Sequence, residues 1–574
     1  MDEVMFSHRT QDNIDFDYEN IVNEGALCPR GHFSYELLSH PMRLGRAYFK
    51  DNGTAVPMLP DIIFQRIARE MKEWKPKFPL ALLIDPTLSL HEIRALLEFA
   101  QMNKISAVDF VAPYDRHMFR ALSELPFEFE ECPDARLLKD QNYVLTIGDV
   151  FTKEPVLSRH LLQSKYAFRA NALFHIDPLP SRTSWFANGF IQSEPHLEPL
   201  LLFKLLKDIW KKEQTAKSSE ILGWLVTTVE KFFGDLWEKK IPATWQPILD
   251  RIAAALTSDK KKVILFSTQI YNAAGGYLSA IACAALSKLT GSFFIPLYSK
   301  SNMRAIRDLA SQAFPGLAIG KKAVLHDTLN RNYHYIFAAG WNPLTAFPGE
   351  LQWPADSRWI ISSLVKGDFP GNTVCLLPQA HAFEQMDLRA NFLPLQSAGS
   401  EPVKTPIGSA LSLSHFIYLL YQKLSDEKVS IRSDSLPTHS SDWKTTVESE
   451  LEYYRSKIAA YDGKTGVWMV PEPHVAHFED AFLSRYSSWA RLDCADNQVL
   501  LPAGIAQKLN LKESDVMSIQ NKEHQAVFQI SIRKKNPENV IIPFAHYTPV
   551  RRMMEGEFAP HNREYYFWCP KINL

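Results

Sequence analysis

Residues 142–177 read NYVLTIGDVFTKEPVLSRHLLQSKYAFRANALFHID, and this stretch decides the fold. A short apolar run comes first and ends at Gly148, which is typical of a buried β-strand followed by a turn. Residues 155–168 then place apolar side chains on neighbouring helical turns, and a second apolar run ends at Asp177. This order of strand, helix and strand predicts a βαβ unit with two parallel strands.

The same pattern recurs on both sides of this unit. A strand pattern is followed by a helix pattern at 79–105, and strand, helix and strand patterns follow one another at 261–298. Two more strand patterns lie at 333–343 and 357–364. We therefore predict an α/β fold built on parallel sheets, interrupted by a helical insertion at 200–260 that is rich in Lys and Glu.

The C-terminal part of the chain has a different pattern. A stretch rich in Ser, Asp and Lys at 425–447 is typical of a linker. Beyond it, short apolar and alternating runs predict mostly β-strands, with one short helix at 502–511. We expect this tail to form a separate small β-barrel.

Charge and cysteine usage limit the classes of function. The chain has 574 residues, in which 63 Lys and Arg balance 64 Asp and Glu to give a net charge of −1. This charge balance argues against a protein that coats nucleic acids and against a polybasic membrane anchor, so no nucleic-acid partner is expected. The closest two of the six cysteines, Cys494 and Cys569, are 75 residues apart, which excludes a zinc ribbon and suits a reducing compartment.

Targeting signals are not visible in the sequence. The N-terminal residues are mixed and charged, without the apolar region of a signal peptide. The longest uncharged stretch, 263–287, contains polar residues and a Gly-Gly pair, so it predicts strand, turn and helix rather than a membrane span. We expect a cytoplasmic protein, either free or peripheral on the inner face of a membrane.

Self-sufficient catalytic motifs are also absent. The sequence has no P-loop, no G-x-G-x-x-G fingerprint and no G-x-S-x-G nucleophile turn. His474 and His477, with Glu479 and Asp480, form the only cluster with metal-like spacing, and we interpret them as surface residues that hydrogen-bond locally. The sequence therefore predicts no catalytic residue and no metal ligand.

Six segments, taken in order, resemble the motifs of one protein family. NEGALCPRGHFSYELLSHPMRL at 23–44 resembles the segment that closes the iron–sulfur site of molybdopterin oxidoreductases. That family has the dimethyl-sulfoxide-reductase and formate-dehydrogenase fold, and it includes the G subunit of NADH–quinone oxidoreductase, which this chain resembles most. The other segments are LLIDPTLSLHEIRALLEFAQ (82–101), TIGDVFTKEPVLSRHLLQSKYAFRANALFHIDPLPSRT (146–183), FAAGWNPL (337–344), TVCLLPQAHAFEQ (373–385) and QVLLPAGIAQKLNLKESDVMSIQNKE (498–523).

The resemblance implies a multi-domain fold with Rossmann-like α/β domains and a C-terminal double-psi β-barrel. Its implied regions are a remnant of the cluster-binding segment at 1–54, a discontinuous α/β domain at 55–137 plus 326–445, a Rossmann-like domain at 138–325 that carries the helical insertion, and the barrel at 461–574.

The chain departs from the family where the family carries its metals. Cys28 is the only cysteine before residue 132, whereas a [4Fe–4S] cluster normally needs four thiolates, so we expect no cluster. Arg30 stands where many members have a Lys between cluster and pterin. Leu88 stands at the position of the molybdenum or tungsten ligand and has no donor atom; a slip of one residue would bring Thr87 or Ser89 there instead.

Three turns match the family's dinucleotide-binding positions. The resemblance implies that the glycines allow close approach of the backbone to a guanine dinucleotide and that Asp177 accepts hydrogen bonds from it. Equally, a glycine ends a strand and an aspartate caps a loop in any α/β domain. The matched residues are Gly148, Asp149, Asp177, Arg182, Thr183, Gly340 and Asn342.

The resemblance and its departures leave three functions open. The first is a non-catalytic scaffold in an NADH- or formate-dehydrogenase-like complex, with iron–sulfur or flavin-containing subunits as partners. The second is an active molybdenum or tungsten enzyme with Thr87 or Ser89 as an unusual ligand. The third is a protein that binds the dinucleotide without a metal. Molybdopterin guanine dinucleotide is thus the one candidate cofactor.

Overall fold

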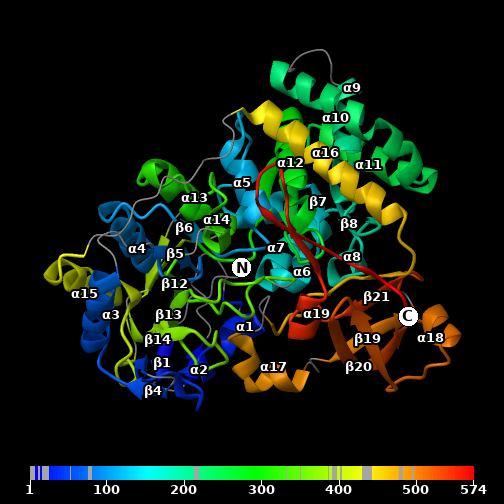
Figure 1. Cartoon of the computed structure of the whole chain (residues 1–574). Coiled ribbons are helices and arrows are strands. Elements are labelled where there is room, and N and C mark those ends of the chain that lie inside the picture. The colour runs from blue at the N-terminus through cyan, green and yellow to red at the C-terminus, as the bar shows by residue number, and fades with distance from the viewer. Residues whose placement is uncertain are drawn as a thin grey trace.

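The computed structural model (Figure 1) shows a mixed α/β chain. No helix among the described residues is long and apolar enough to cross a membrane. The structure describes residues 7–10, 13–15, 25–26, 28–51, 54–74, 80–212, 219–330, 333–349, 351–385, 387–390, 397–400, 402, 404–429, 442–477, 482–493, 497–534 and 536–574.

The predicted βαβ unit lies at the centre of a five-stranded parallel sheet. β7 pairs with β8 in parallel, with Val144 opposite Leu173, and α7 connects the two strands. This confirms the strand, helix and strand predicted from residues 142–177. The sheet has the order β11-β10-β7-β8-β9. Its elements are β7 (Tyr143–Ile147), α6 (Val150–Lys153), α7 (Pro155–Ala167), β8 (Ala172–Asp177), α8 (Arg182–Trp185), β9 (Gly189–Gln192), β10 (Lys262–Ser267), α12 (Gly276–Thr290) and β11 (Phe293–Leu297).

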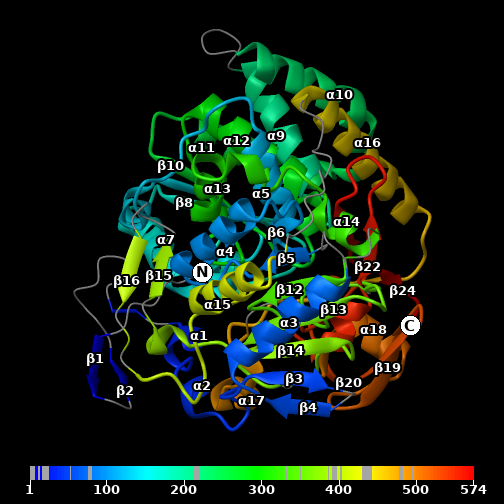
Figure 2. The ribbon, with the colours of Figure 1, turned by 60° about the vertical axis from the view of Figure 1, so that its left-hand side comes forward.

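A second sheet of seven strands has the order β4-β3-β14-β13-β12-β5-β6. Its strands come from segments far apart in the chain, since β5 pairs directly with β12. Figure 2 shows α3 and α15 side by side against this sheet, where Phe64 and Phe416 meet. The elements are β3 (Tyr48–Asp51), β4 (Thr54–Pro57), α3 (Pro60–Trp74), β5 (Leu80–Ile84), α4 (Leu90–Met102), β6 (Val108–Phe110), α5 (Arg116–Glu124), β12 (Tyr335–Ala339), β13 (Arg358–Ser363), β14 (Thr373–Pro378) and α15 (Leu413–Asp426).

Asp115, which precedes α5, joins the two sheets. Its carboxylate accepts a hydrogen bond from Thr268 Oγ1 (2.6 Å), beyond β10 of the five-stranded sheet. It also accepts from the backbone N–H (2.7 Å) and Oγ (2.8 Å) of Ser299 and from the backbone N–H of Lys300 (3.0 Å), beyond β11. One buried carboxylate thus holds the carboxyl ends of strands from both sheets at one place.

Four helices gather at one end of the molecule, at the top of Figure 1: α9 (Glu198–Lys212), α10 (Glu220–Lys240), α11 (Gln246–Thr257) and α16 (Trp443–Asp462). The first three lie in the predicted helical insertion. The linker predicted at 425–447 is wrong at its end, because α16 begins at Trp443. Asp442 caps that helix by accepting the backbone N–H groups of Lys444 and Thr445, and a buried apolar stripe continues through Leu451.

The C-terminal part is rich in β-strands, as predicted. Its six-stranded sheet has the order β19-β20-β18-β21-β17-β24, and β22 and β23 form a separate pair. The elements are β17 (Val467–Met469), α17 (Ser488–Asp493), β18 (Gln498–Pro502), α18 (Ala503–Lys508), β19 (Val516–Asn521), β20 (His524–Arg533), β21 (Val540–Pro543), α19 (Thr548–Arg552), β22 (Glu555–Phe558), β23 (Tyr565–Trp568) and β24 (Lys571–Ile572). The other α-helices and strands that the structure describes are β1 (Ser7–Thr10), β2 (Asn13–Asp15), α1 (Pro29–His32), α2 (Glu36–Ser39), α13 (Met303–Gln312), α14 (Val324–Asn330), β15 (Asp387–Ala390) and β16 (Ser397–Ser400).

Candidate functional site

Gly148 ends β7 in a left-handed turn, with φ of +76°. A Cβ placed on it would lie 2.3 Å from the carbonyl oxygen of Ser267 and 3.0 Å from Nδ2 of Asn272. Glycine is therefore required here because the chain itself approaches the turn closely. The space beside Gly148 that the resemblance assigns to a dinucleotide is filled by the end of β10.

Asp149 and Thr183 form a buried hydrogen-bonded pair at this edge. Thr183 Oγ1 donates to Asp149 Oδ1 (2.7 Å) and accepts the backbone N–H of Phe151 (2.9 Å). The other carboxylate oxygen of Asp149, Oδ2, is buried without a hydrogen-bond partner among the described residues. This oxygen is one hydrogen-bond acceptor available to a ligand, whereas a dinucleotide-binding site needs several hydrogen-bond donors and acceptors.

Asp177 at the end of β8 bonds within the protein. It accepts a hydrogen bond from the Tyr271 hydroxyl (2.8 Å) and another from the backbone N–H of Leu179 (2.7 Å). Burial, and next the negative charge of Asp149, raise the pKa of Asp177 well above its usual value. Arg182, predicted beside them, is exposed to solvent. The structure thus brings Gly148, Asp149, Asp177 and Thr183 together, with their polar groups largely used by the fold.

Gly340 and Asn342 lie in the other sheet, beyond β12. Gly340 also has a left-handed backbone, with φ of +83°, and a Cβ on it would lie 2.9 Å from Cδ2 of Leu88. Asn342 accepts the backbone N–H of Leu344 (2.9 Å) and donates to the carbonyl of Asp368 (3.0 Å), which fixes its loop. Leu88, which the resemblance aligns with a metal-ligand position, therefore covers the glycine that was predicted to face the cofactor.

The residues beside Leu88 also have structural roles. Thr87 Oγ1 donates to Asp85 (2.7 Å). Ser89 precedes α4, and its backbone N–H donates to the buried Glu92 (3.1 Å) in a capping box. Cys28 is a buried thiol in front of α1, and the described residues contain no group of three His, Cys, Asp or Glu arranged to hold a metal ion. The side chains described at these positions are used within the fold, so they do not fit the metal and dinucleotides that the resemblance implies.

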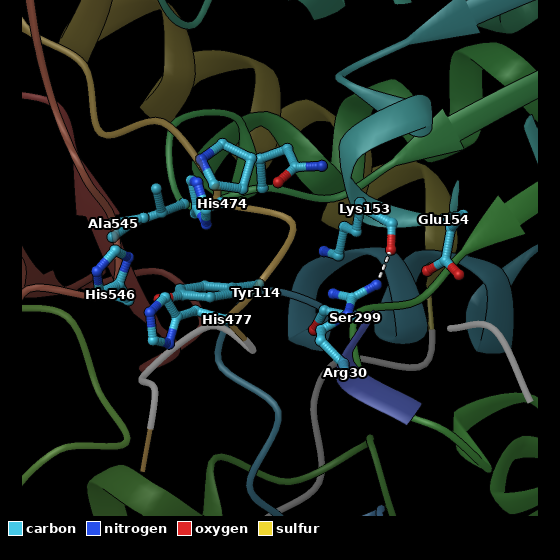
Figure 3. A pocket seen from close by; sticks show the side chains of 12 residues that line it. Arg30, Tyr114, Lys153, Glu154, Ser299, His474, His477, Ala545 and His546 are labelled. Atoms are coloured by element: carbon cyan, nitrogen blue, oxygen red, sulfur yellow. Dashed lines mark hydrogen bonds between the residues drawn. The ribbon is translucent and has the colours of Figure 1, made fainter. Parts of the chain in front are cut away.

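A cavity of about 560 Å³, including its opening to solvent, lies where several parts of the chain meet. Its lining residues come from α1, from the end of α6, from the turns beyond strands β6, β10 and β11, and from two loops of the C-terminal part. They are Arg30, Tyr114, Lys153, Glu154, Gln269, Ile270, Ser299, Pro473, His474, His477, Ala545 and His546. Figure 3 shows the three histidines on one side of the space and Arg30, Lys153 and Glu154 on the other.

Hydrogen bonds fix the basic side of the cavity. The Arg30 guanidinium donates to the carbonyl of Lys153, and the Lys153 ammonium donates to the carbonyl of Thr268. Since Thr268 in turn donates to Asp115, the two cations are tied to the junction of the two α/β sheets. Arg30, which the resemblance placed near the pterin, thus points toward this cavity.

Three histidines form the opposite side. The rings of His477 and His546 stack with centroids 3.9 Å apart, and His474 lies 6.1 Å and 6.2 Å from them. Sequence reasoning placed His474 and His477 at the surface, which is wrong for His477 because only 5% of it is exposed. Glu479 and Asp480, predicted beside them, lie outside the described residues.

Sequence reasoning missed several residues of these sites. Tyr271 and Asn272 follow β10 in a stretch that was assigned only a turn, and His546 follows β21 with no recognisable motif. The one available signal was their place after the ends of strands, where open α/β sheets gather functional side chains.

Comparison with solved structures finds a chain of similar fold. The chain resembles acetylene hydratase from Pelobacter acetylenicus over 96% of its own length and 94% of that chain, with a TM-score of 0.68 and 11% sequence identity. The multi-domain α/β fold implied by the sequence motifs is thereby supported. No protein-family model matches the chain, and no curated protein matches it by sequence.

Proposed function

We propose that the chain is a non-catalytic subunit with a molybdopterin-oxidoreductase type of fold, which organises a redox complex of the NADH- or formate-dehydrogenase kind. Its partners would be chains that carry iron–sulfur clusters or flavin. We further infer the domain limits given by the resemblance, a double-psi barrel at 461–574 and a cytoplasmic location.

One observation carries this proposal: Leu88 packs over Gly340. An apolar side chain at the ligand position cannot coordinate a metal, and here it also takes the space beside the turn that would face the dinucleotide. The filled turn at Gly148 supports the same conclusion in the other sheet. A fold of this size, with side chain and backbone packed against these two turns, offers large surfaces on which partner chains can dock.

Cofactor analysis tests the non-catalytic part. The chain would be produced in cells that make molybdopterin, beside an enzyme of the same fold that loads its cofactor there. We expect molybdenum and tungsten far below stoichiometric amounts by mass spectrometry, and no guanine nucleotide released on acid denaturation. Stoichiometric metal would overturn the proposal in favour of an active enzyme, and guanine nucleotide without metal would make the chain a dinucleotide-binding protein.

Isolation of the native complex tests the scaffold part. We expect the tagged chain to co-purify at a fixed ratio with chains whose flavin absorbance or iron–sulfur electron paramagnetic resonance signals are absent from the isolated chain. A chain that elutes alone from its own cells, without redox-active partners, would contradict the scaffold role.

A further inference from the structure

Three strongly exposed aromatic side chains lie close together beside the five-stranded sheet. Tyr166 is in the last turn of α7, Phe168 follows the end of that helix, and Trp185 is the last residue of α8. Each of the three is between 66% and 71% exposed. Single exposed aromatic residues are ordinary on protein surfaces, but three at one place form an apolar patch of the kind that marks an interaction site.

Lys165 joins the two halves of this patch. Its ammonium group lies 4.9 Å from the centroid of the Tyr166 ring, and it donates a hydrogen bond to the carbonyl of Phe186, the residue after Trp185. The end of α7 and the end of α8 are therefore neighbours, and their exposed rings belong to one surface. The name aromatic–basic surface is used below for Lys165, Tyr166, Phe168, Arg169 and Trp185.

Hydrogen bonds place this surface at the amino ends of the strands. Asn188, just before β9, accepts the backbone N–H of Leu173 in β8 on its Oδ1 (3.0 Å), and its own backbone N–H donates to the carbonyl of Leu173 (2.7 Å). The side chain of Asn142, before β7, donates to Oδ1 of Asn171, before β8 (3.0 Å). The cavity lies beyond the carboxyl ends of strands of the same sheet, so the two regions are separate.

Cations outnumber carboxylates at this end of the sheet. From 155 to 193 the sequence has four Lys and Arg but one acidic residue, Asp177, which is fully buried. Arg251 of α11 adds a cation beside β9, where it donates to the carbonyl of Asn188 (3.4 Å). The turns before β7 and β10 and helix α11 carry the other charged residues: Lys139, Asp140, Asp250, Asp259, Lys260 and Lys261. Because the excess comes from several elements, the net charge of −1 does not reveal it.

This combination of side chains fits the headgroup region of an anionic lipid bilayer. Aromatic rings settle at the boundary between headgroups and acyl chains, and Lys and Arg beside them are attracted to anionic lipids. Surfaces that bind proteins are poor in Lys at their centre and hold their aromatic anchors in closely packed pockets. The rings of Phe168 and Trp185 are instead more than two-thirds exposed, and Lys165 lies between the two helix ends.

We propose that the aromatic–basic surface binds peripherally to an anionic lipid bilayer. The rings of Tyr166, Phe168 and Trp185 enter the headgroup region, and Lys165 and Arg169 face the anionic headgroups. The carboxyl ends of the five-stranded sheet then point away from the bilayer. This inference goes beyond the proposed function, because it requires neither a cofactor nor a partner chain.

Flotation of the full chain with lipid vesicles tests this. We expect binding to phosphatidylcholine vesicles that contain about 30% phosphatidylserine, and binding weaker by about tenfold or more to pure phosphatidylcholine. Phe168→Ser and Trp185→Ser should each weaken binding by about tenfold, because each removes an exposed ring from the bilayer contact. Arg169→Gln should weaken binding by about fivefold, because it removes one charge beside the headgroups.

Two matched variants make the result specific. Tyr418→Ser removes a ring that is 62% exposed on α15, beside the other sheet, and should leave binding unchanged. Arg94→Gln removes an exposed cation of α4 that pairs with Glu98, and it should also have no effect. Melting temperatures identify any variant that fails to fold. Since the three test substitutions are at exposed and separate side chains, the remaining ones still test the surface.

Absence of flotation with the phosphatidylserine vesicles would overturn the proposal, and so would equal weakening by Trp185→Ser and Tyr418→Ser. If the vesicles do not bind and an acidic partner chain protects Trp185 from hydroxyl-radical oxidation in the native complex, the surface binds a protein and not lipid. None of these results changes the metal and nucleotide content of the chain, which tests the proposed function separately.

Discussion

Leu88 lies directly over Gly340, so closely that a Cβ on the glycine would come within 2.9 Å of Leu88 Cδ2. Gly340 ends β12, whereas Leu88 follows β5, its neighbour in the sheet. The resemblance to the family aligns Gly340 with a cofactor-binding turn and Leu88 with a metal ligand. In this chain the two residues pack against each other.

Gly340→Ala should destabilise the protein by about 1–3 kcal/mol, because alanine disfavours a φ of +83° and its methyl group would press on Leu88. Adding Leu88→Ala should relieve the contact, so that the double variant loses less than the sum of the two single variants. Urea denaturation gives the three free energies of unfolding.

Gly371→Ala is the matched control, since a Cβ there meets no atom within 4 Å. It should change the free energy of unfolding by less than about 0.5 kcal/mol. Strict additivity of Leu88→Ala and Gly340→Ala would show that the two side chains do not share this space.

Asp115→Asn should destabilise the junction of the two sheets by about 2–4 kcal/mol, because the amide NH₂ would face groups that donate to the carboxylate. Hydrogen exchange should quicken at Thr268, Ser299 and Lys300. Asp250→Asn on α11 should have almost no effect, because among the described residues this aspartate accepts just one surface hydrogen bond, from Gln246. Equal destabilisation by the two substitutions would contradict the role of Asp115.

Glu198 in the first turn of α9 should make stability depend on pH. It is 1% exposed, neither carboxylate oxygen has a partner among the described residues, and burial raises its pKa to about 8. Since the unfolded pKa is the lower one, the folded state holds an extra proton between about pH 5 and 8. The free energy of unfolding should therefore fall with rising pH in that window, by up to about 1.4 kcal/mol per unit.

Glu198→Gln removes this titration and should flatten the curve between pH 5 and 8, as measured by urea denaturation at each pH. Glu220→Gln, at the exposed first turn of α10, should leave the slope as it is. A wild-type slope that survives in Glu198→Gln would place the pH dependence on another group.

The buried cysteines should be unreactive in the folded protein. Cys28, Cys132, Cys283, Cys375 and Cys569 are all buried, and burial raises the thiol pKa of Cys132 to about 11. In a Cys494→Ser variant, Ellman's reagent at pH 8 should label none of these five thiols until denaturant is added, and then all of them. Rapid labelling of Cys28 in the native protein would show that the segment around α1 opens.

The sequence predicted local structure well wherever apolar runs had a clear period. The strands of 142–177 and their connecting helix are present with parallel pairing, since buried parallel strands are recognisable as short continuous apolar runs. Helix α16 was partly missed, because its first residues share the Ser-, Asp- and Lys-rich composition of a linker. The apolar stripe that includes Leu451 is buried against neighbouring helices, which the local composition does not reveal.

By itself, the sequence indicated the α/β class, the order of its motifs, a single cysteine before residue 132 and a leucine at position 88. Only the tertiary structure decided which groups lie beside the two glycine turns. Ser267 fills the turn at Gly148, Leu88 fills the turn at Gly340, and Arg30 faces His474 across a cavity. The reason is that hydrophobic periodicity indicates which side chains are buried within one helix or strand. The two residues in each of these pairs lie about 120 to more than 400 positions apart in the sequence, so only the packing of whole sheets and loops brings them near each other.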